Sequence, residues 1–137
     1  MTRRGWICAG TMLVLATCLA TLLVLRQRGL PASAADGSYV NDCCGKMVLS
    51  DGTLILGDKG ERSVSYVVER DEKGPFILPK FYVGPWENRG FQIDGSRPAL
   101  PLRLDRLPAP TTIQLYDYPK SYLFRRQSLK LHGLIAR

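Results

Sequence analysis

The chain has 137 residues, of which 45% are hydrophobic and 23% charged, and its 19 basic and 12 acidic side chains give a net charge of +7. From residue 36 onward 15 basic residues stand against 12 acidic ones, an excess of only +3, which argues against a nucleic-acid-binding protein. His132 is the only histidine, so zinc sites built on histidine and the Ser-His and Cys-His catalytic schemes lack their parts.

The first element is a block without charged side chains over residues 6–25, with Arg3 and Arg4 before it and Arg26 and Arg28 after it. Twenty helical residues extend about 30 Å, which is the thickness of the hydrocarbon core of a bilayer. The slight excess of positive charge on the N-terminal side predicts that the following domain lies outside the cytoplasm. We therefore expect a signal-anchor segment over residues 1–28 that makes the chain a single-pass protein of the cell membrane.

A cleaved signal peptide is the alternative interpretation of the same segment. Ala32-Ser33-Ala34 and Ser33-Ala34-Ala35 follow the small-x-small pattern of cleavage sites. The start of the chain, Thr2-Arg3-Arg4-Gly5-Trp6-Ile7, also resembles a twin-arginine export signal, which implies an exported product. The length of the apolar run favours the anchor, because signal-peptide cores usually have about 7–15 residues. Cleavage would give a secreted or periplasmic domain.

Residues 29–38 are small, contain Pro31 and lack periodicity, which predicts a linker. The β domain is expected over residues 39–137, because short apolar runs alternate there with turn signals. Asp51-Gly52 is the strongest hairpin signal, and Pro79 predicts a broken or edge strand because proline lacks the ladder donor. We predict an all-β fold, a small sandwich or barrel of about seven short strands. The candidate strands cover residues 46–50, 53–56, 63–69, 76–83 (interrupted), 91–93, 100–104, 111–116 and 121–125.

Cys43 and Cys44 are adjacent in the predicted β domain. Their Cα atoms are about 3.8 Å apart across a trans peptide, whereas an ordinary disulfide joins Cα atoms about 4.4–6.8 Å apart. Three states stay open: two free thiols with at least one of them buried, a strained bridge between the two neighbours, or a bridge to another chain.

The most informative loop covers residues 84–90. Trp86, Asn88 and Arg89 lie in it, and Tyr82 lies beside it. Trp, Tyr and Arg are the residues that most often anchor protein interfaces, and loops carry function more often than strands do. These four residues are the predicted partner contact. The competing interpretation is that Trp86 and Phe91 simply cap the core.

No set of residues supplies a catalytic centre, a metal site or a cofactor site, so the chain is expected not to be an enzyme and to need no cofactor. The leading hypothesis is a membrane-anchored or exported binding module with a protein partner, of inhibitor or immunity type. Its contact with the membrane would run through residues 6–25, and no nucleic acid is expected as a partner. The alternative is an envelope thiol protein or enzyme that uses Cys43 and Cys44.

Overall fold

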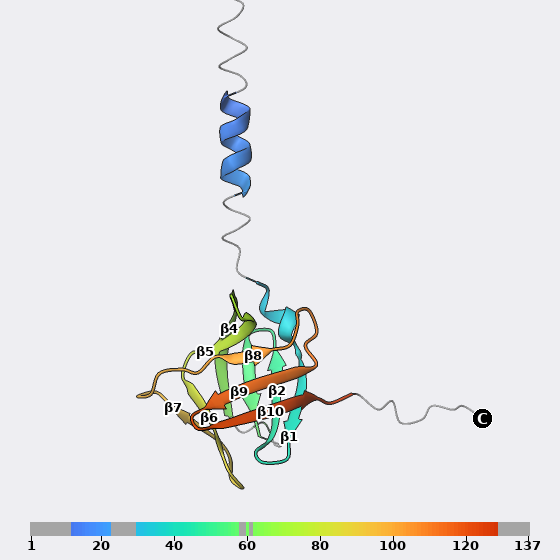
Figure 1. Cartoon of the computed structure of the whole chain (residues 1–137), viewed down its shortest axis with the longest axis vertical. Helices are drawn as coiled ribbons and strands as arrows, with labels where there is room; N and C mark the ends of the chain where they lie inside the picture. Colours follow the sequence, from blue (N-terminus) through green and yellow to red (C-terminus); the bar gives the residue numbers. More distant parts are fainter. Residues whose placement is uncertain (1–11, 23–29, 58–59, 61, 129–137) are drawn as a thin grey trace, which may run out of the picture.

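The computed structural model describes residues 12–22, 30–57, 60 and 62–128. Eight of the ten strands in these ranges form a closed antiparallel barrel in the order β1-β10-β9-β8-β5-β4-β3-β2, and β6 and β7 form a separate hairpin (Figure 1). An eight-stranded barrel is just wide enough for side chains to fill its interior. Tyr39, Met47, Leu54, Ile77 and Phe124 are among the fully buried residues of its core.

The elements follow one another with short connections. In chain order they are the 3-10 helix η1 (Ala32–Ala35), β1 (Gly37–Asn41), β2 (Gly45–Ser50), β3 (Thr53–Leu56), β4 (Arg62–Asp71), β5 (Gly74–Pro79), β6 (Tyr82–Trp86), β7 (Gly90–Asp94), β8 (Leu102–Leu104), β9 (Thr112–Asp117) and β10 (Lys120–Arg126).

Local sequence signals explain much of this barrel. Asp51 and Gly52 have φ values of 43° and 83°, the positive values that a tight hairpin turn between β2 and β3 requires. In β4 the buried residues Val64, Tyr66 and Val68 alternate with exposed ones, as expected for a strand with one face on the core. The prediction of an all-β fold is confirmed, and of its two architectures the structure has the barrel.

Three differences from the predicted elements concern strand number and boundaries. The described chain has ten strands rather than about seven, because residues 37–41 form β1 and the expected 84–90 loop is mostly strand. In that loop only residues 87–89 turn, since Gly84, Pro85 and Trp86 pair with Gln92, Phe91 and Gly90. Most of the expected linker over 29–38 is also structured.

The prediction of a linker is wrong for residues 32–38. Small side chains in this segment pack against the barrel instead. Ala35 is fully buried, and the backbone N–H of Ala109 donates to the carbonyl oxygen of Ala34 at 2.9 Å. Small size at these positions therefore reflects close packing of η1 rather than a lack of structure.

Part of the expected N-terminal segment is described, and it is a helix over residues 12–22 with exposed apolar side chains. The remaining positions of the predicted 6–25 segment lie outside the described residues. No helix within the described ranges is long and apolar enough to cross a membrane.

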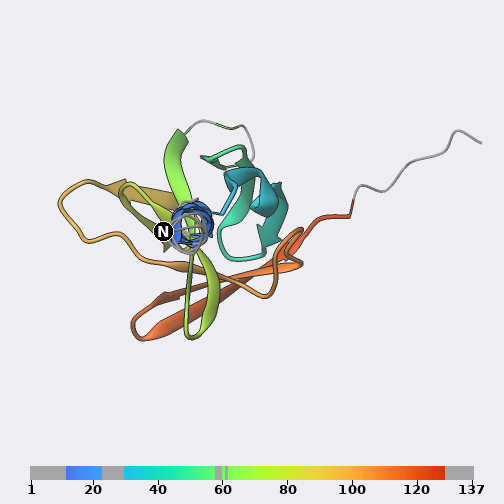
Figure 2. The ribbon, with the colours of Figure 1, turned by 90° about the horizontal axis from the view of Figure 1, so that it is seen from above.

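The two ends of the barrel are closed by different elements. η1 lies over one end, which faces the viewer in Figure 2, and β1 runs from there to the opposite end (Figures 1 and 2). The β6–β7 hairpin closes that opposite end, where Phe91 packs on Phe124 with ring centroids 5.7 Å apart. The turn between β1 and β2, which holds Cys43 and Cys44, lies at this hairpin end.

Candidate functional site

The hairpin end gathers most of the residues that the sequence singled out. The chain leaves the barrel after Pro79 at the end of β5, forms β6, turns at residues 87–89 and returns as β7. The backbone N–H of Arg89 donates to the carbonyl oxygen of Trp86 at 2.8 Å, which closes the turn. Asn88 has a φ of 62°, a left-handed conformation that asparagine tolerates better than most residues. We call residues 86–89 the hairpin tip.

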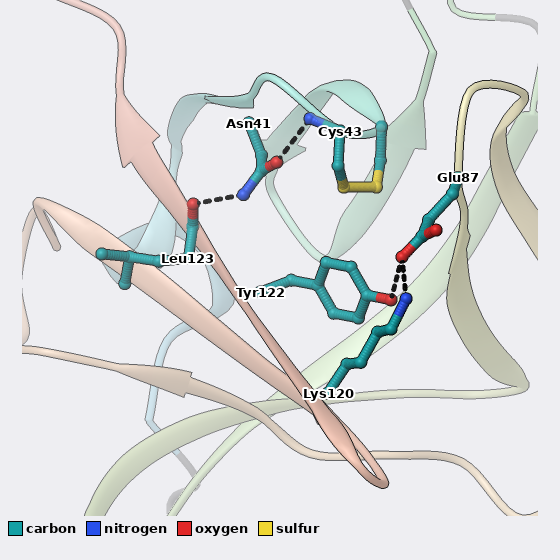
Figure 3. The surroundings of a disulfide bond; sticks show 7 residues. Asn41, Cys43, Glu87, Lys120, Tyr122 and Leu123 are labelled. Carbon is teal, nitrogen blue, oxygen red and sulfur yellow. Dashed lines mark hydrogen bonds and ion pairs between the residues drawn. A yellow bond between two sulfur atoms is a disulfide. The ribbon is translucent and has the colours of Figure 1, made fainter.

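Two residues hold the hairpin tip against the barrel, Asn88 and Glu87. The backbone N–H of Asn88 donates to the carbonyl oxygen of Cys43 at 3.3 Å. Glu87 forms an ion pair with Lys120 of β10 and accepts a long hydrogen bond of 3.4 Å from the Tyr122 hydroxyl (Figure 3). The hydrogen bond from Lys120 lowers the pKa of Glu87, so the pair is charged at neutral pH.

Cys43 and Cys44 form a disulfide with each other, which is the second of the three states left open by the sequence (Figure 3). Asn41 fixes the turn around it, because its side-chain oxygen accepts from the Cys43 N–H at 2.7 Å and its amide nitrogen donates to the Leu123 carbonyl at 2.6 Å. Cys43 is half-buried and Cys44 is 4% exposed. The disulfide therefore lies at the edge of the core, directly beneath the hairpin tip.

Three of the four predicted contact residues come together on the surface of this tip. Trp86 is 47% exposed, and the Arg89 guanidinium lies 5.2 Å from the centroid of its ring. Asn88, which lies between them in the sequence, is also exposed. Stacking of a guanidinium on an indole orients both groups while leaving their edges open to a ligand.

Tyr82 lies elsewhere, at the base of the hairpin, and is 1% exposed. Its hydroxyl donates to a carboxylate oxygen of Asp117 at 2.6 Å, and the Arg97 guanidinium lies 3.7 Å from its ring centroid. Burial raises the pKa of Tyr82, and the carboxylate that accepts its proton raises it further. Tyr82 thus fastens the hairpin to β9 and is not on the surface with Trp86.

A pocket of about 130 Å³ lies beside the hairpin tip. Its lining includes Trp86, Arg89 and Phe91 from the β6–β7 hairpin, Leu56 from β3 and Arg62 from β4. Arg62 donates to the Phe91 carbonyl oxygen at 3.3 Å, which joins the start of β4 to the hairpin. The sequence analysis missed Arg62 and Leu56, because only the pairing of β3 with β4 brings them to this end of the barrel.

The titratable groups of the described residues form no metal centre, since no cluster of three or more His, Cys, Asp or Glu side chains occurs among them. His132 lies outside the described residues. What the hairpin end offers chemically is an aromatic face, two guanidinium groups, a small pocket and a disulfide.

Comparison with known proteins gives no indication of function, so the function is inferred from this geometry alone. The chain matches no protein-family model, no curated protein and no solved structure.

Proposed function

We propose that this chain is a non-enzymatic binding module, anchored in or exported across the cell membrane, that contacts a protein partner through its hairpin tip. The observation that carries the proposal is the exposure of Trp86 at the hairpin tip, where the neighbouring residues Glu87 and Asn88 are already bound to the barrel. Half of the indole surface is in water although the barrel core has closed without it. Trp and Arg anchor protein interfaces more often than other residues do, and Arg89 stacks on this tryptophan.

The attachment of the tip supports a binding role because it limits the entropy lost on association. Glu87, Asn88 and the β6–β7 pairing restrict the tip before any partner arrives. A preorganised contact surface loses less conformational freedom on binding than a free loop does.

We further propose that residues 6–25 anchor the chain in the membrane, with cleavage as a signal peptide as the alternative. The chain enters the barrel at Leu30, which pairs with Val68, and η1 follows directly. An anchor would therefore connect to the η1 end, leaving the hairpin tip at the end of the barrel remote from that connection. An inhibitor or immunity-type protein that awaits its partner outside the cytoplasm would have this arrangement.

Native electrophoresis of a tagged full-length chain, produced in its native host, tests the proposal. The chain should migrate in a complex larger than itself, and Trp86→Ala should lower the stability of that complex about thirtyfold, because hot-spot truncations cost about 2 kcal/mol or more. Tyr116→Ala is the matched control, since Tyr116 is exposed on β9 but does not belong to the tip. Equal migration of wild type and Trp86→Ala would contradict the proposal.

The disulfide supports a second candidate, an envelope thiol protein. A dithiol could reduce the Cys43–Cys44 bond, which would accept two electrons and two protons and give two thiols while the dithiol became a disulfide. Replacing both cysteines by Ser separates the two functions. Partner binding that survives Cys43→Ser with Cys44→Ser supports the binding module, and loss of a dithiol-dependent activity supports the thiol protein.

A further inference from the structure

We infer that the pocket beside Trp86 receives one carboxylate-bearing residue of the partner. This inference rests on the proposed function and names the chemistry of the contact. Its evidence is the charge, the size and the lining of the pocket.

The charge of the lining is positive. Arg62 of β4 and Arg89 of the hairpin line the pocket, and none of the acidic side chains that the structure describes does so. Glu87, which follows the lining residue Trp86 in sequence, is paired with Lys120 of β10. Guanidinium groups present several N–H donors in a planar fork that matches a carboxylate, and such charge-assisted hydrogen bonds are stronger than neutral ones.

Two further contacts fix the guanidinium groups. Arg62 donates one hydrogen bond to the Phe91 carbonyl, and Arg89 stacks on the Trp86 ring. An arginine has five N–H donors, so a single hydrogen bond to a backbone carbonyl leaves others for a ligand. Both arginines that line this small cavity therefore have a defined contact of their own.

The pocket is large enough for only one side chain or chain terminus of the partner. A volume of about 130 Å³ corresponds to about four water molecules, whereas pockets for cofactors and drug-sized ligands have about 300–1,000 Å³. The buried side chains of Leu56 and Phe91 give it an apolar floor. An apolar floor under a cationic rim fits a short carbon chain that ends in a carboxylate better than a phosphate group, which is polar on every side.

Fluorescence of Trp86 offers a direct test with the purified full-length chain in detergent. The chain has two tryptophans, so Trp6→Phe leaves Trp86 as the only one. The probes are N-acetyl-leucine for a main-chain carboxylate and N-acetyl-glutamate α-amide for a side-chain carboxylate. N-acetyl-leucinamide and N-acetyl-glutamine amide are their neutral partners, and inorganic phosphate is the rival anion.

At least one carboxylate should change the Trp86 emission saturably, and its neutral partner should bind about tenfold more weakly or worse, as expected when a hydrogen bond to a charged group is lost. The better of the two carboxylates identifies the source, a chain terminus or an acidic side chain. Arg62→Gln and Arg89→Gln should each weaken binding to a similar extent. Arg125→Gln, an exposed arginine of β10 outside this pocket, should leave it unchanged.

Equal binding of charged and neutral probes would overturn the inference, as would tighter binding of phosphate or the absence of any saturable change. These outcomes are distinct from failure of the proposed function. If Trp86→Ala dissolves the native complex but no carboxylate binds, the tip is still the contact surface and only the chemistry assigned to its pocket is wrong.

Discussion

The two ends of this barrel are closed in opposite ways. At the η1 end, the Tyr39 hydroxyl oxygen lies 3.1 and 3.2 Å from the carbonyl oxygens of Ala35 and Pro110, and the Tyr66 hydroxyl donates to the Ala32 carbonyl at 3.1 Å. Arg126 donates to the Pro110 carbonyl at 2.8 Å and also binds the Asp36 carbonyl. These polar groups find their partners within the chain.

At the hairpin end, the closure leaves groups in contact with solvent. Phe91 completes the core, but Trp86, Asn88 and Arg89 remain on the surface above the disulfide. Sealing the barrel requires Phe91 and Tyr82, which are buried, and does not require the exposed tryptophan. The η1 end is therefore closed by contacts within the chain, whereas the hairpin tip leaves an aromatic ring and a guanidinium group exposed.

The largest expected effect is a loss of folding stability caused by a substitution at the η1 end. Tyr39→Ala should lower the free energy of unfolding by about 3–5 kcal/mol, because it removes a fully buried aromatic side chain. Urea denaturation followed by circular dichroism measures this loss. Tyr39→Phe is the control, and it should cost much less because it keeps the ring. A loss below about 1 kcal/mol for Tyr39→Ala would contradict the assignment of this end to stability.

Gly84→Ala tests the base of the hairpin. A Cβ atom at this position would fall on the Tyr82 phenol, which already has Arg97 against its ring. We expect a loss of about 1–3 kcal/mol in stability, as for other overpacked sites. Gly95→Ala is a milder control, because its Cβ would lie 3.8 Å from Phe81, an ordinary contact. Equal stability of the two variants would show that Tyr82 does not fasten the hairpin.

Alkaline titration tests the burial of Tyr66 at the η1 end. Burial raises the pKa of Tyr66 from 10.0 to about 12, so between these values the unfolded chain loses a proton that the folded chain keeps. Stability should therefore be unaffected by this group below pH 10 and should fall as the pH rises toward 12. Tyr66→Phe should make this part of the decline shallower. An unchanged slope would mean that Tyr66 ionises equally in both states.

The smallest effect concerns the Glu87–Lys120 pair. Both side chains are exposed, so Lys120→Met should hardly change the stability of the barrel. The Asn88 amide should nevertheless exchange its hydrogen faster, because the tip loses one of its two attachments. Hydrogen exchange resolved at the tip detects this, and high salt should have the same effect on the unsubstituted chain. Unchanged exchange would show that the ion pair does not hold the tip.

Local signals in the sequence were sufficient for much of the barrel. Asp51-Gly52 marks the β2–β3 turn, and Pro79 marks the point at which the chain leaves the barrel. The choice between barrel and sandwich depends on the pairing of Tyr39 with Arg126, two residues far apart in the sequence. No local pattern encodes such a contact, since closure is a property of the whole sheet.

The residues of the candidate site could also be predicted only in part from the sequence. Trp86, Asn88 and Arg89 could be found because they are close in sequence and of types that form interfaces. Tyr82 could not be separated from them, because the boundary of β6 was not visible in a segment rich in Gly and Pro. Its burial also depends on contacts with Asp117 and Arg97, which lie far from it in the sequence. Arg62 could not be found because it reaches the pocket only through the pairing of β4 with β3.

Site-directed photocrosslinking tests most directly the claim that function resides at the hairpin end. A photoreactive amino acid would replace Asn88 at the tip in one full-length variant and Lys73 in another. Lys73 is exposed in the turn after β4, at the other end of the strand that begins at Arg62 beside the pocket. In native cells, irradiation should give a discrete protein adduct at position 88 that Trp86→Ala abolishes, and none at position 73. An adduct at position 73 alone, or one at position 88 that persists in Trp86→Ala, would contradict the account.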